Sequence, residues 1–276
     1  QPLSGSPANL AVYMALLNPG EKIMGMSLPS GGHLTHGEKI SASGRFFTSV
    51  QYNVTREGLL DYAELQKMAQ KEKPQIIVAG FTAYPRIIDF KQFADIAHDV
   101  GAYFMVDMAH IAGLVAAGSH PSPFPHADVV TTTTHKSLRG PRGAIIFSRN
   151  DKIIQKNGKD TTITRQIDKA VFPGLQGGPH DNQTTAIAVA LLEAVKPAFK
   201  KYGYQIVKNA KALAHGLQKH GFQLVSNGTD NHLMLIDLTN RGISGREAQD
   251  RLEAVNIIVN RNTVPYDTRS PFDPSG

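Results

Sequence analysis

Apolar runs that alternate with helical patterns constrain the fold of this chain more than any other feature of its sequence. The helical pattern of residues 61–74 is followed by the run QIIVAGF at 75–81, and that of residues 89–101 by AYFMVDM at 102–108. Runs without polar alternation are typical of strands buried on both faces of a parallel sheet. Helices that connect parallel strands cross over the sheet and cover it. The pattern therefore predicts an α/β fold with a mostly parallel sheet flanked by helices.

Residues 127–135 and 143–148 form two further strand candidates. The connection between them, which contains Lys136, is too short for a crossover helix, so this last pair is predicted to be antiparallel. Ligands of open α/β sheets bind beyond the carboxyl ends of the strands. The segments that follow the predicted strands are therefore where we expect functional side chains.

Capping residues predict where several helices begin. Ser6 is a candidate N-cap with Pro7 at the first helical position, and Asp61 is a candidate N-cap of the next long helix. Two long helices are predicted farther along the chain, at 182–201 and 204–220.

After residue 182, long helical stretches replace the alternation of strands and helices. This change predicts that the chain has two domains. Residues 1–195 are interpreted as a large, ligand-binding domain, and residues 196–276 as part of a smaller α+β domain. The short elements expected there are strands at 222–226, 232–238 and 256–260 and a helix at 244–255. So few elements cannot form a complete second core, and the smaller domain is predicted to be incomplete.

Composition excludes several classes of protein. The chain has no cysteine, which excludes disulfides, thiolate nucleophiles and cysteine-based zinc sites and favours a cytoplasmic location. No apolar run approaches the roughly 18 residues that span a bilayer, so no membrane association is expected. The formal net charge is +6, but lysine and arginine are spread along the chain without a basic block. Nucleic-acid binding is therefore not favoured.

A lysine and a carboxylate stand at the ends of two predicted strands. Lys136 follows the run TTTTH, and burial would lower its pKa and supply the neutral amine that attacks an aldehyde. Asp107 ends an apolar strand, where a buried carboxylate needs a cationic partner. Ser4, Gly5 and Ser6 precede a predicted helix, as in many phosphate sites. Each feature alone has an ordinary structural explanation, but pyridoxal phosphate would satisfy all of them, through its aldehyde, ring nitrogen and phosphate.

These motifs, in this order, resemble those of the fold-type I pyridoxal-phosphate enzymes, and within them the serine hydroxymethyltransferase family. The matching stretches run almost from end to end of the chain and are SGSPAN, GGHLTHG, VDMAHIAGLVAAG, VVTTTTHKSLRGPRG, VFPGLQGGP, GTDNHL and SPFDPSG. The four threonines followed by His-Lys are the most specific of them.

The resemblance implies roles for the residues at matching positions. Lys136 would carry the cofactor covalently, Asp107 would pair with its ring nitrogen, and His33 would stack on its ring. Thr82 stands where the family commonly has a serine, and it keeps the hydroxyl. The other residues implied at the cofactor or in catalysis are Ser4, Gly5, Ser6, His110, Thr133, His135, Arg142, Gly177 and Gly178.

The resemblance also implies an activity, a second substrate and a partner. The activity is the reversible interconversion of serine and glycine, with transfer of the one-carbon unit to tetrahydrofolate. Leu28, Leu34 and Asn262 match positions that the family uses for the pteridine of this folate. Gly177 and Gly178 match a turn that reaches the cofactor phosphate of the other subunit, which implies a homodimer or homotetramer.

Other functions remain open at this point. Another fold-type I enzyme, such as a threonine aldolase or an aminotransferase, would not need the folate residues. A non-enzymatic RNA-binding protein would use the basic charge, although no nucleic-acid motif is present. A metal site built from His33, His36, His110 and His135 is not favoured, because no His-x-x-x-His pair with a carboxylate lies on a clear helix.

The two ends of the sequence suggest that the chain is truncated. It starts at Gln1 rather than Met, and the family's N-terminal arm, with its catalytic glutamate and tyrosines, has no counterpart here. The family's carboxylate-binding arginine lies just beyond the Ser-Gly at which this chain stops. Residues 1–276 alone are therefore expected to bind pyridoxal phosphate without turning over serine.

Overall fold

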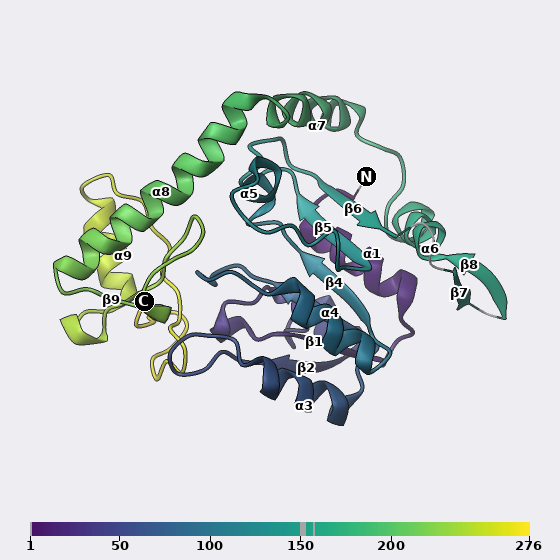
Figure 1. The fold of residues 1–276 in the computed structure, drawn as a ribbon, viewed down its shortest axis with the longest axis horizontal. Helices are drawn as coiled ribbons and strands as arrows, with labels where there is room; N and C mark the ends of the chain where they lie inside the picture. Colours follow the sequence, from purple (N-terminus) through teal and green to yellow (C-terminus); the bar gives the residue numbers. More distant parts are fainter. Residues whose placement is uncertain (1, 150–152, 157) are drawn as a thin grey trace.

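A sheet of six strands lies at the centre of the structure, a computed structural model that describes residues 2–149, 153–156 and 158–276 (Figure 1). The strands are β1 (Lys22–Met26), β2 (Thr48–Tyr52), β3 (Ile76–Gly80), β4 (Tyr103–Asp107), β5 (Val129–Thr133) and β6 (Ala144–Ser148). Their order is β2-β1-β3-β4-β5-β6, with parallel pairs from β2 to β5 and an antiparallel pair between β5 and β6. This arrangement confirms the predicted α/β class and the predicted antiparallel pair.

Both faces of the sheet are buried, which explains the uninterrupted apolar runs. Successive strand residues point to opposite faces. In β3, Ile76 and Val78 belong to one apolar cluster, whereas Ile77 and Ala79 belong to a second cluster on the other face. All four side chains are fully buried.

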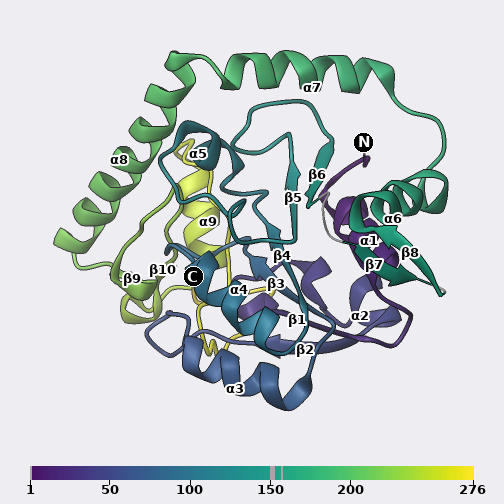
Figure 2. The ribbon, with the colours of Figure 1, turned by 45° about the vertical axis from the view of Figure 1, so that its right-hand side comes forward.

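Helices cover each face (Figure 2). The first cluster includes residues of α1 (Gly5–Leu16) and α6 (Ile163–Lys169), and the second includes residues of α3 (Tyr62–Glu72), α4 (Phe90–Asp99) and α5 (Ala112–Ala117). The predicted N-cap of α3 is confirmed, because the Asp61 carboxylate accepts hydrogen bonds from the backbone N–H groups of Ala63 and Glu64, both at 3.0 Å. A short helix, α2 (Ala42–Phe46), precedes β2.

Two long helices lead away from the sheet, α7 (Asp181–Ala194) and α8 (Pro197–Lys219). Figure 1 shows α8 running from the side of the sheet to a smaller group of elements that includes the C-terminus. This group contains α9 (Gly245–Glu253) and an antiparallel pair of short strands, β9 (Gln223–Leu224) and β10 (Ile236–Asp237). The division into domains at residues 195 and 196 stays a prediction.

Two predicted helix boundaries are wrong. The N-cap of α1 is Ser4 rather than Ser6, since the backbone of Ser4 is extended and the helix already begins at Gly5. The two long helices separate at residues 195 and 196, earlier than predicted. Pro197 decides this boundary, because proline is compatible with the first turn of α8, where a backbone N–H has no helical partner.

The predicted strand at 256–260 is also wrong. These residues have no strand partner in the part of the chain that the structure describes, and Ile258 is 77% exposed. Conversely, β2 and the hairpin of β7 (Ile153–Lys156) and β8 (Lys159–Thr162) were not predicted from the sequence. Gln1 lies outside the described residues. In the described residues, no helix combines the length and apolar character needed to cross a bilayer.

Candidate active site

The predicted site residues follow the carboxyl ends of neighbouring strands. Asp107 ends β4, Lys136 lies three residues beyond β5, and Thr82 lies two residues beyond β3. His33 follows β1 and is the N-cap of a short 3-10 helix, η2 (Leu34–His36). Since these strands are parallel, their carboxyl ends meet at one edge of the sheet, where ligands of such folds bind.

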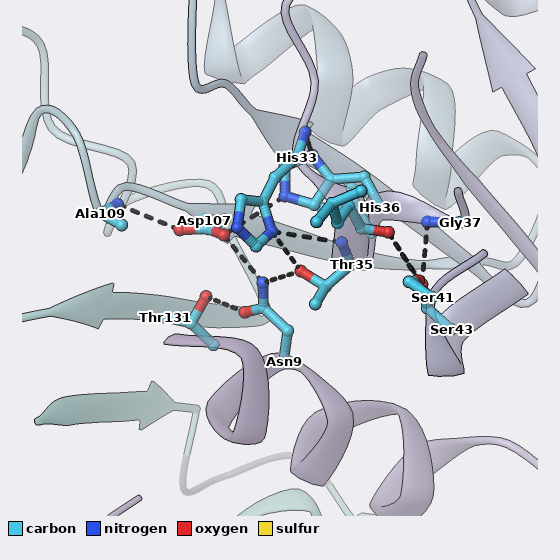
Figure 3. Close-up of polar contacts among 12 residues, drawn as sticks. Asn9, His33, Thr35, His36, Gly37, Ser41, Ser43, Asp107, Ala109 and Thr131 are labelled. Carbon is cyan, nitrogen blue, oxygen red and sulfur yellow. Dashed lines mark hydrogen bonds and ion pairs between the residues drawn. The ribbon is translucent and has the colours of Figure 1, made fainter. Parts of the chain in front are cut away.

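Asp107 is held by three hydrogen-bond donors (Figure 3). Its Oδ2 accepts from Asn9 Nδ2 at 2.8 Å and from His36 Nε2 at 3.3 Å, and its Oδ1 accepts from the backbone N–H of Ala109 at 3.0 Å. Burial raises the pKa of Asp107, but the hydrogen bond and charge of His36 and the other two donors outweigh it and leave the pKa below its usual range. The carboxylate is therefore ionised and suited to a cationic partner.

Asn9, which was not among the residues predicted from the sequence, connects Asp107 to two neighbouring elements. Its side chain lies in α1 and is 1% exposed. Nδ2 donates to Thr35 Oγ1 as well as to Asp107, both at 2.8 Å, and Oδ1 accepts from Thr131 Oγ1 at 2.7 Å. Figure 3 shows the amide between the Asp107 carboxylate and the hydroxyls of both threonines. One side chain thus fixes the helix, β4, β5 and the loop of His33 relative to one another.

His33 and His36 lie beside Asp107, and the three residues offer ligand atoms within 4.8 Å of one another. His36 Nδ1 accepts from the backbone N–H of His33 at 3.3 Å, while its Nε2 donates to Asp107. His33 Nδ1 pairs with Thr35 Oγ1 at 2.7 Å. These hydrogen bonds account for the close approach of the three side chains without a metal ion. That the site holds no metal stays a prediction. His110 and His135, considered with them in the sequence, are not part of the trio.

Burial keeps two site histidines neutral. It lowers the pKa of His33 to about 4, with a further contribution from the charge of His36. It lowers the pKa of His110 to about 3, where the charge of Lys136 acts in the same direction. Near pH 7 both rings can therefore stack on an aromatic group or accept a hydrogen bond without carrying a charge.

Lys136 is partly buried, and its environment favours the neutral amine. Burial lowers its pKa from the usual value, the charge of Asp107 opposes this, and the charge of Arg142 adds to it. The net direction is downward. A lower pKa raises the fraction of the amine that is able to attack a carbonyl carbon.

The start of α1 forms the third part of the site. Ser4 Oγ accepts a hydrogen bond from Arg142 Nη1 at 3.1 Å instead of capping the helix, and the same nitrogen lies 3.5 Å from His135 Nε2. Gly5 packs so closely on β5 that an added Cβ would lie 2.8 Å from Thr133 Cγ2. A guanidinium, a hydroxyl and a helix N-terminus therefore converge at a place suited to an anion.

Two buried hydroxyls at the site point to a bound group. Thr82 Oγ1 and Thr133 Oγ1 have no hydrogen-bond partner among the described residues. Leaving a buried hydroxyl unpaired costs about 1–3 kcal/mol, so a ligand that pairs with it would be stabilised there. Ser6, exposed on the first turn of α1, offers a further hydroxyl. Together with an ionised carboxylate, a lysine of lowered pKa and a neutral histidine, these groups fit pyridoxal phosphate.

The residues predicted to bind the folate or to reach a neighbouring subunit lie at or near the surface. Gly177 and Gly178 are exposed, and a Cβ built on either would meet no other part of the described chain within 4 Å. Leu28 and Leu34 are each 41% exposed. The backbone of Asn262 pairs with that of the last residue, and no hydrogen bond in the described chain links Asn262 to the segments of the two leucines.

Sequence signals existed for two of the residues that were missed. Asn9 follows Ala8 and precedes Ala11 and Val12 on the buried side of a helix, where an unpaired amide would be costly. His36 stands in GGHLTHG beside His33, but the sequence does not show which histidine reaches Asp107. Only the three-dimensional fold assigns the hydrogen bond with Asp107 to His36.

The fold and this site together define a class of protein. A mostly parallel sheet that carries an ionised aspartate at the end of one strand and a lysine just beyond the next, with a helix N-terminus packed beside them, is the arrangement of a fold-type I pyridoxal-phosphate enzyme. Comparison with known proteins then gives the family. Residues 1–276 match the serine hydroxymethyltransferase family, and the chain belongs to it.

Individual relatives agree with this assignment. Serine hydroxymethyltransferase of Desulfotalea psychrophila is 59% identical over 276 residues, which are 100% of this chain and 62% of the relative. The proteins of the same name from Acidothermus cellulolyticus and Xanthomonas axonopodis pv. citri are 56% and 54% identical over 100% of this chain, and 62% and 64% of their own lengths are covered. The chain thus spans less than two thirds of each of these relatives.

Proposed function

We propose that the protein interconverts serine and glycine reversibly and exchanges the one-carbon unit with tetrahydrofolate, using pyridoxal phosphate. The observation that carries the proposal is the pair formed by Asp107, held ionised by three donors, and Lys136, whose pKa is lowered by burial. Membership of the serine hydroxymethyltransferase family supports the choice of reaction among those that such a pair can serve.

Each end of the cofactor has a group of residues suited to hold it. Lys136 would bind its aldehyde carbon, Asp107 its ring nitrogen and His33 the face of its ring. The phosphate would be bound by Ser4, Gly5, Ser6 and Arg142. Thr82 would bind the phenolic oxygen, His110 would lie near this oxygen or the substrate carboxylate, and Thr133 and His135 would flank Lys136. When bound, pyridoxal phosphate supplies an electron sink that stabilises negative charge on the substrate while a bond to Cα breaks.

The residues of this chain would control protons and orientation during the reaction. Asp107 would keep a proton on the ring nitrogen, because its own pKa lies below the usual range. Lys136, with its lowered pKa, would exchange a proton with the substrate carbon once it is free of the cofactor. His110, whose pKa is about 3, would stay neutral and accept a hydrogen bond from the substrate or cofactor.

Exposed leucines support a folate site next to the His33 loop. Leu28 lies in η1 (Leu28–Ser30) and Leu34 in η2, on either side of His33, and both offer apolar side chains to solvent. A pteridine is a flat, partly apolar group that such side chains can cover. We propose that Asn262 adds an amide for its polar edge.

An exposed helix supports association of two or more copies. Not one residue of α7 is buried, although its sequence is apolar enough to include Val189 at 55% and Leu192 at 62% exposure. Exposed apolar surface of this kind is typical of protein–protein contacts. Gly177 and Gly178, just before α7 and open to solvent, would then reach the cofactor phosphate of the neighbouring subunit in a homodimer or homotetramer.

The absence of cysteine supports a cytoplasmic location.

The central experiment tests Lys136 and the folate together. Serine cleavage should require tetrahydrofolate, and borohydride should fix the cofactor to the protein. Lys136→Ala should lose the covalent link and at least about 100-fold in turnover, whereas Lys67→Ala, at an exposed lysine, should keep both. A covalent link that survives in Lys136→Ala would refute the assignment. Cleavage of 3-hydroxy amino acids that is indifferent to folate would favour the threonine aldolase alternative.

A further inference from the structure

The ring of His110 is packed against a second imidazole from the smaller group of elements at the C-terminal end. His232 stacks on it with ring centroids 6.0 Å apart and an interplanar angle of 19°. The two residues lie far apart in the sequence, His110 just beyond β4 and His232 between β9 and β10. The backbone of His110 is fixed separately, since its carbonyl accepts a hydrogen bond from Ser137 Oγ at 2.9 Å. The stack is thus a contact that acts on the ring itself.

His232 is itself held from both sides along its own chain. Asn231, which is 0% exposed, donates from Nδ2 to the carbonyl of Tyr84 at 3.0 Å and accepts the backbone N–H of Leu233 at 3.0 Å. The backbone N–H of Asp230 donates to the carbonyl of Pro85 at 2.9 Å. Residues on either side of His232 are therefore anchored, directly or through Asn231, to the segment that follows Thr82.

An ion pair strengthens this anchorage. Arg86 Nη1 lies 3.0 Å from Asp230 Oδ1, and Arg86 Nε donates to the carbonyl of Ser226 at 3.1 Å. Both side chains of the pair are partly buried, so solvent screens the attraction less than at an open surface. The loop that carries His232 therefore has one defined position over the sheet edge.

The stacked rings are both neutral near pH 7. Burial lowers the pKa of His232 to about 4, and the pKa of His110 is about 3. Two neutral imidazoles stack without the repulsion that two charged rings would feel, and a flat partner restricts rotation of the ring it covers. In addition, His232 Nδ1 is buried and has no hydrogen-bond partner among the described residues.

We propose that His232 is a positioning residue for the reaction, which acts by holding the ring of His110 at a fixed angle toward the site. The inference rests on the proposed function, in which His110 contacts the substrate or cofactor. It also gives the C-terminal elements a direct role at the reacting centre, because the ring that orients His110 comes from the loop between β9 and β10.

The test compares two apolar replacements that differ in planarity. His232→Phe keeps a flat ring, whereas His232→Leu fills much of the space without one, and His215→Leu on the exposed side of α8 is the control. The first readout is the nuclear magnetic resonance signal of the His110 ring in the cofactor-free protein, which does not depend on any activity. The second is kcat and KM for serine in the complete enzyme, with the unfolding temperature measured for every variant.

We expect a single sharp His110 ring signal in the parent and in His232→Phe, and a broadened or averaged one in His232→Leu. The leucine variant should lose about threefold to tenfold in kcat, which corresponds to the interaction energy of one aromatic pair. Its KM should be nearly unchanged. His232→Phe should stay within about threefold of the parent. An unchanged His110 signal in His232→Leu would overturn the proposal even if activity fell, and so would equal losses in the two variants. A changed His110 signal without serine turnover in the parent would leave positioning intact and refute the proposed function instead.

Discussion

Asp107 shows how single residues set the chemistry of this site. Burial alone would favour its protonated form, yet the donors from Asn9, His36 and Ala109 reverse the direction of the pKa shift. Only the ionised form of Asp107 can hold a proton on the nitrogen of a bound pyridine ring. Its function thus depends on its neighbours as much as on its own identity.

Asp107→Asn should therefore remove most of the activity without unfolding the protein. A neutral amide is nearly the same size but cannot stabilise a protonated ring nitrogen, so we expect turnover of serine to fall by about 100-fold or more. Activity and circular dichroism are measured side by side, with Asp168→Asn as the exposed control. Full activity in Asp107→Asn would reduce Asp107 to a residue that merely ends a strand.

Asn9→Ala should destabilise the fold as well as the site. The change leaves the Thr131 hydroxyl without its acceptor and the Asp107 carboxylate without one donor. Unpaired buried groups of this kind cost about 1–3 kcal/mol in the free energy of unfolding, which urea titration measures. Asn182→Ala, on exposed α7, should change it by less than about 0.5 kcal/mol. If both variants are equally stable, the bridging amide has no energetic role.

At the scale of elements, α8 depends on one glycine for its contact with α5. A Cβ added to Gly203 would lie 2.3 Å from the Cβ of Ala117, whereas one added to Gly216 on the same helix would meet nothing within 4 Å. The Tyr204 hydroxyl, next to Gly203, also donates to the carbonyl of Gly118 at 2.9 Å. Close approach of the two backbones therefore fixes the course of α8 toward the C-terminal elements.

The two glycines should respond in opposite directions to alanine. Gly216→Ala should raise the free energy of unfolding by about 0.4–1 kcal/mol, because alanine reduces the freedom of the unfolded chain. Gly203→Ala should lower it by about 1–3 kcal/mol despite the same gain in helix propensity, since α8 must move away from α5. Urea titration of both variants gives the comparison. Stabilisation by Gly203→Ala would show that the helices are not in tight contact.

At the scale of the whole molecule, buried histidines make stability depend on pH. The pKa values of His33, His110 and His232 are lowered from 6.5 to about 4, about 3 and about 4 in the folded protein. Between these values and 6.5, the unfolded chain binds more protons than the folded one. The stabilisation is therefore present above about pH 7 and is lost as the pH falls toward about 4.

This prediction is checked by urea unfolding of the cofactor-free protein, followed by circular dichroism at a series of pH values from about 7 down to about 4. The free energy of unfolding should fall steadily across the series. His110→Gln should flatten the decline, because a glutamine does not titrate, whereas His215→Gln at an exposed position should not. A free energy that is constant over this range would mean that the three rings titrate normally in the folded state.

Local patterns in the sequence were enough to predict the α/β class, the antiparallel last pair and the positions of Lys136 and Asp107 at strand ends. They were enough because periodicity and strand ends are local properties, and burial on both faces leaves an uninterrupted apolar run in the sequence. The folded structure was needed to find that Asn9 and His36 hold Asp107, across 98 and 71 residues, and that His232 stacks on His110. Local patterns indicate that a polar side chain is buried, but they do not indicate which residue forms a hydrogen bond with it. That choice follows from how the strand ends, α1 and the C-terminal loop pack together, which no single stretch of sequence encodes.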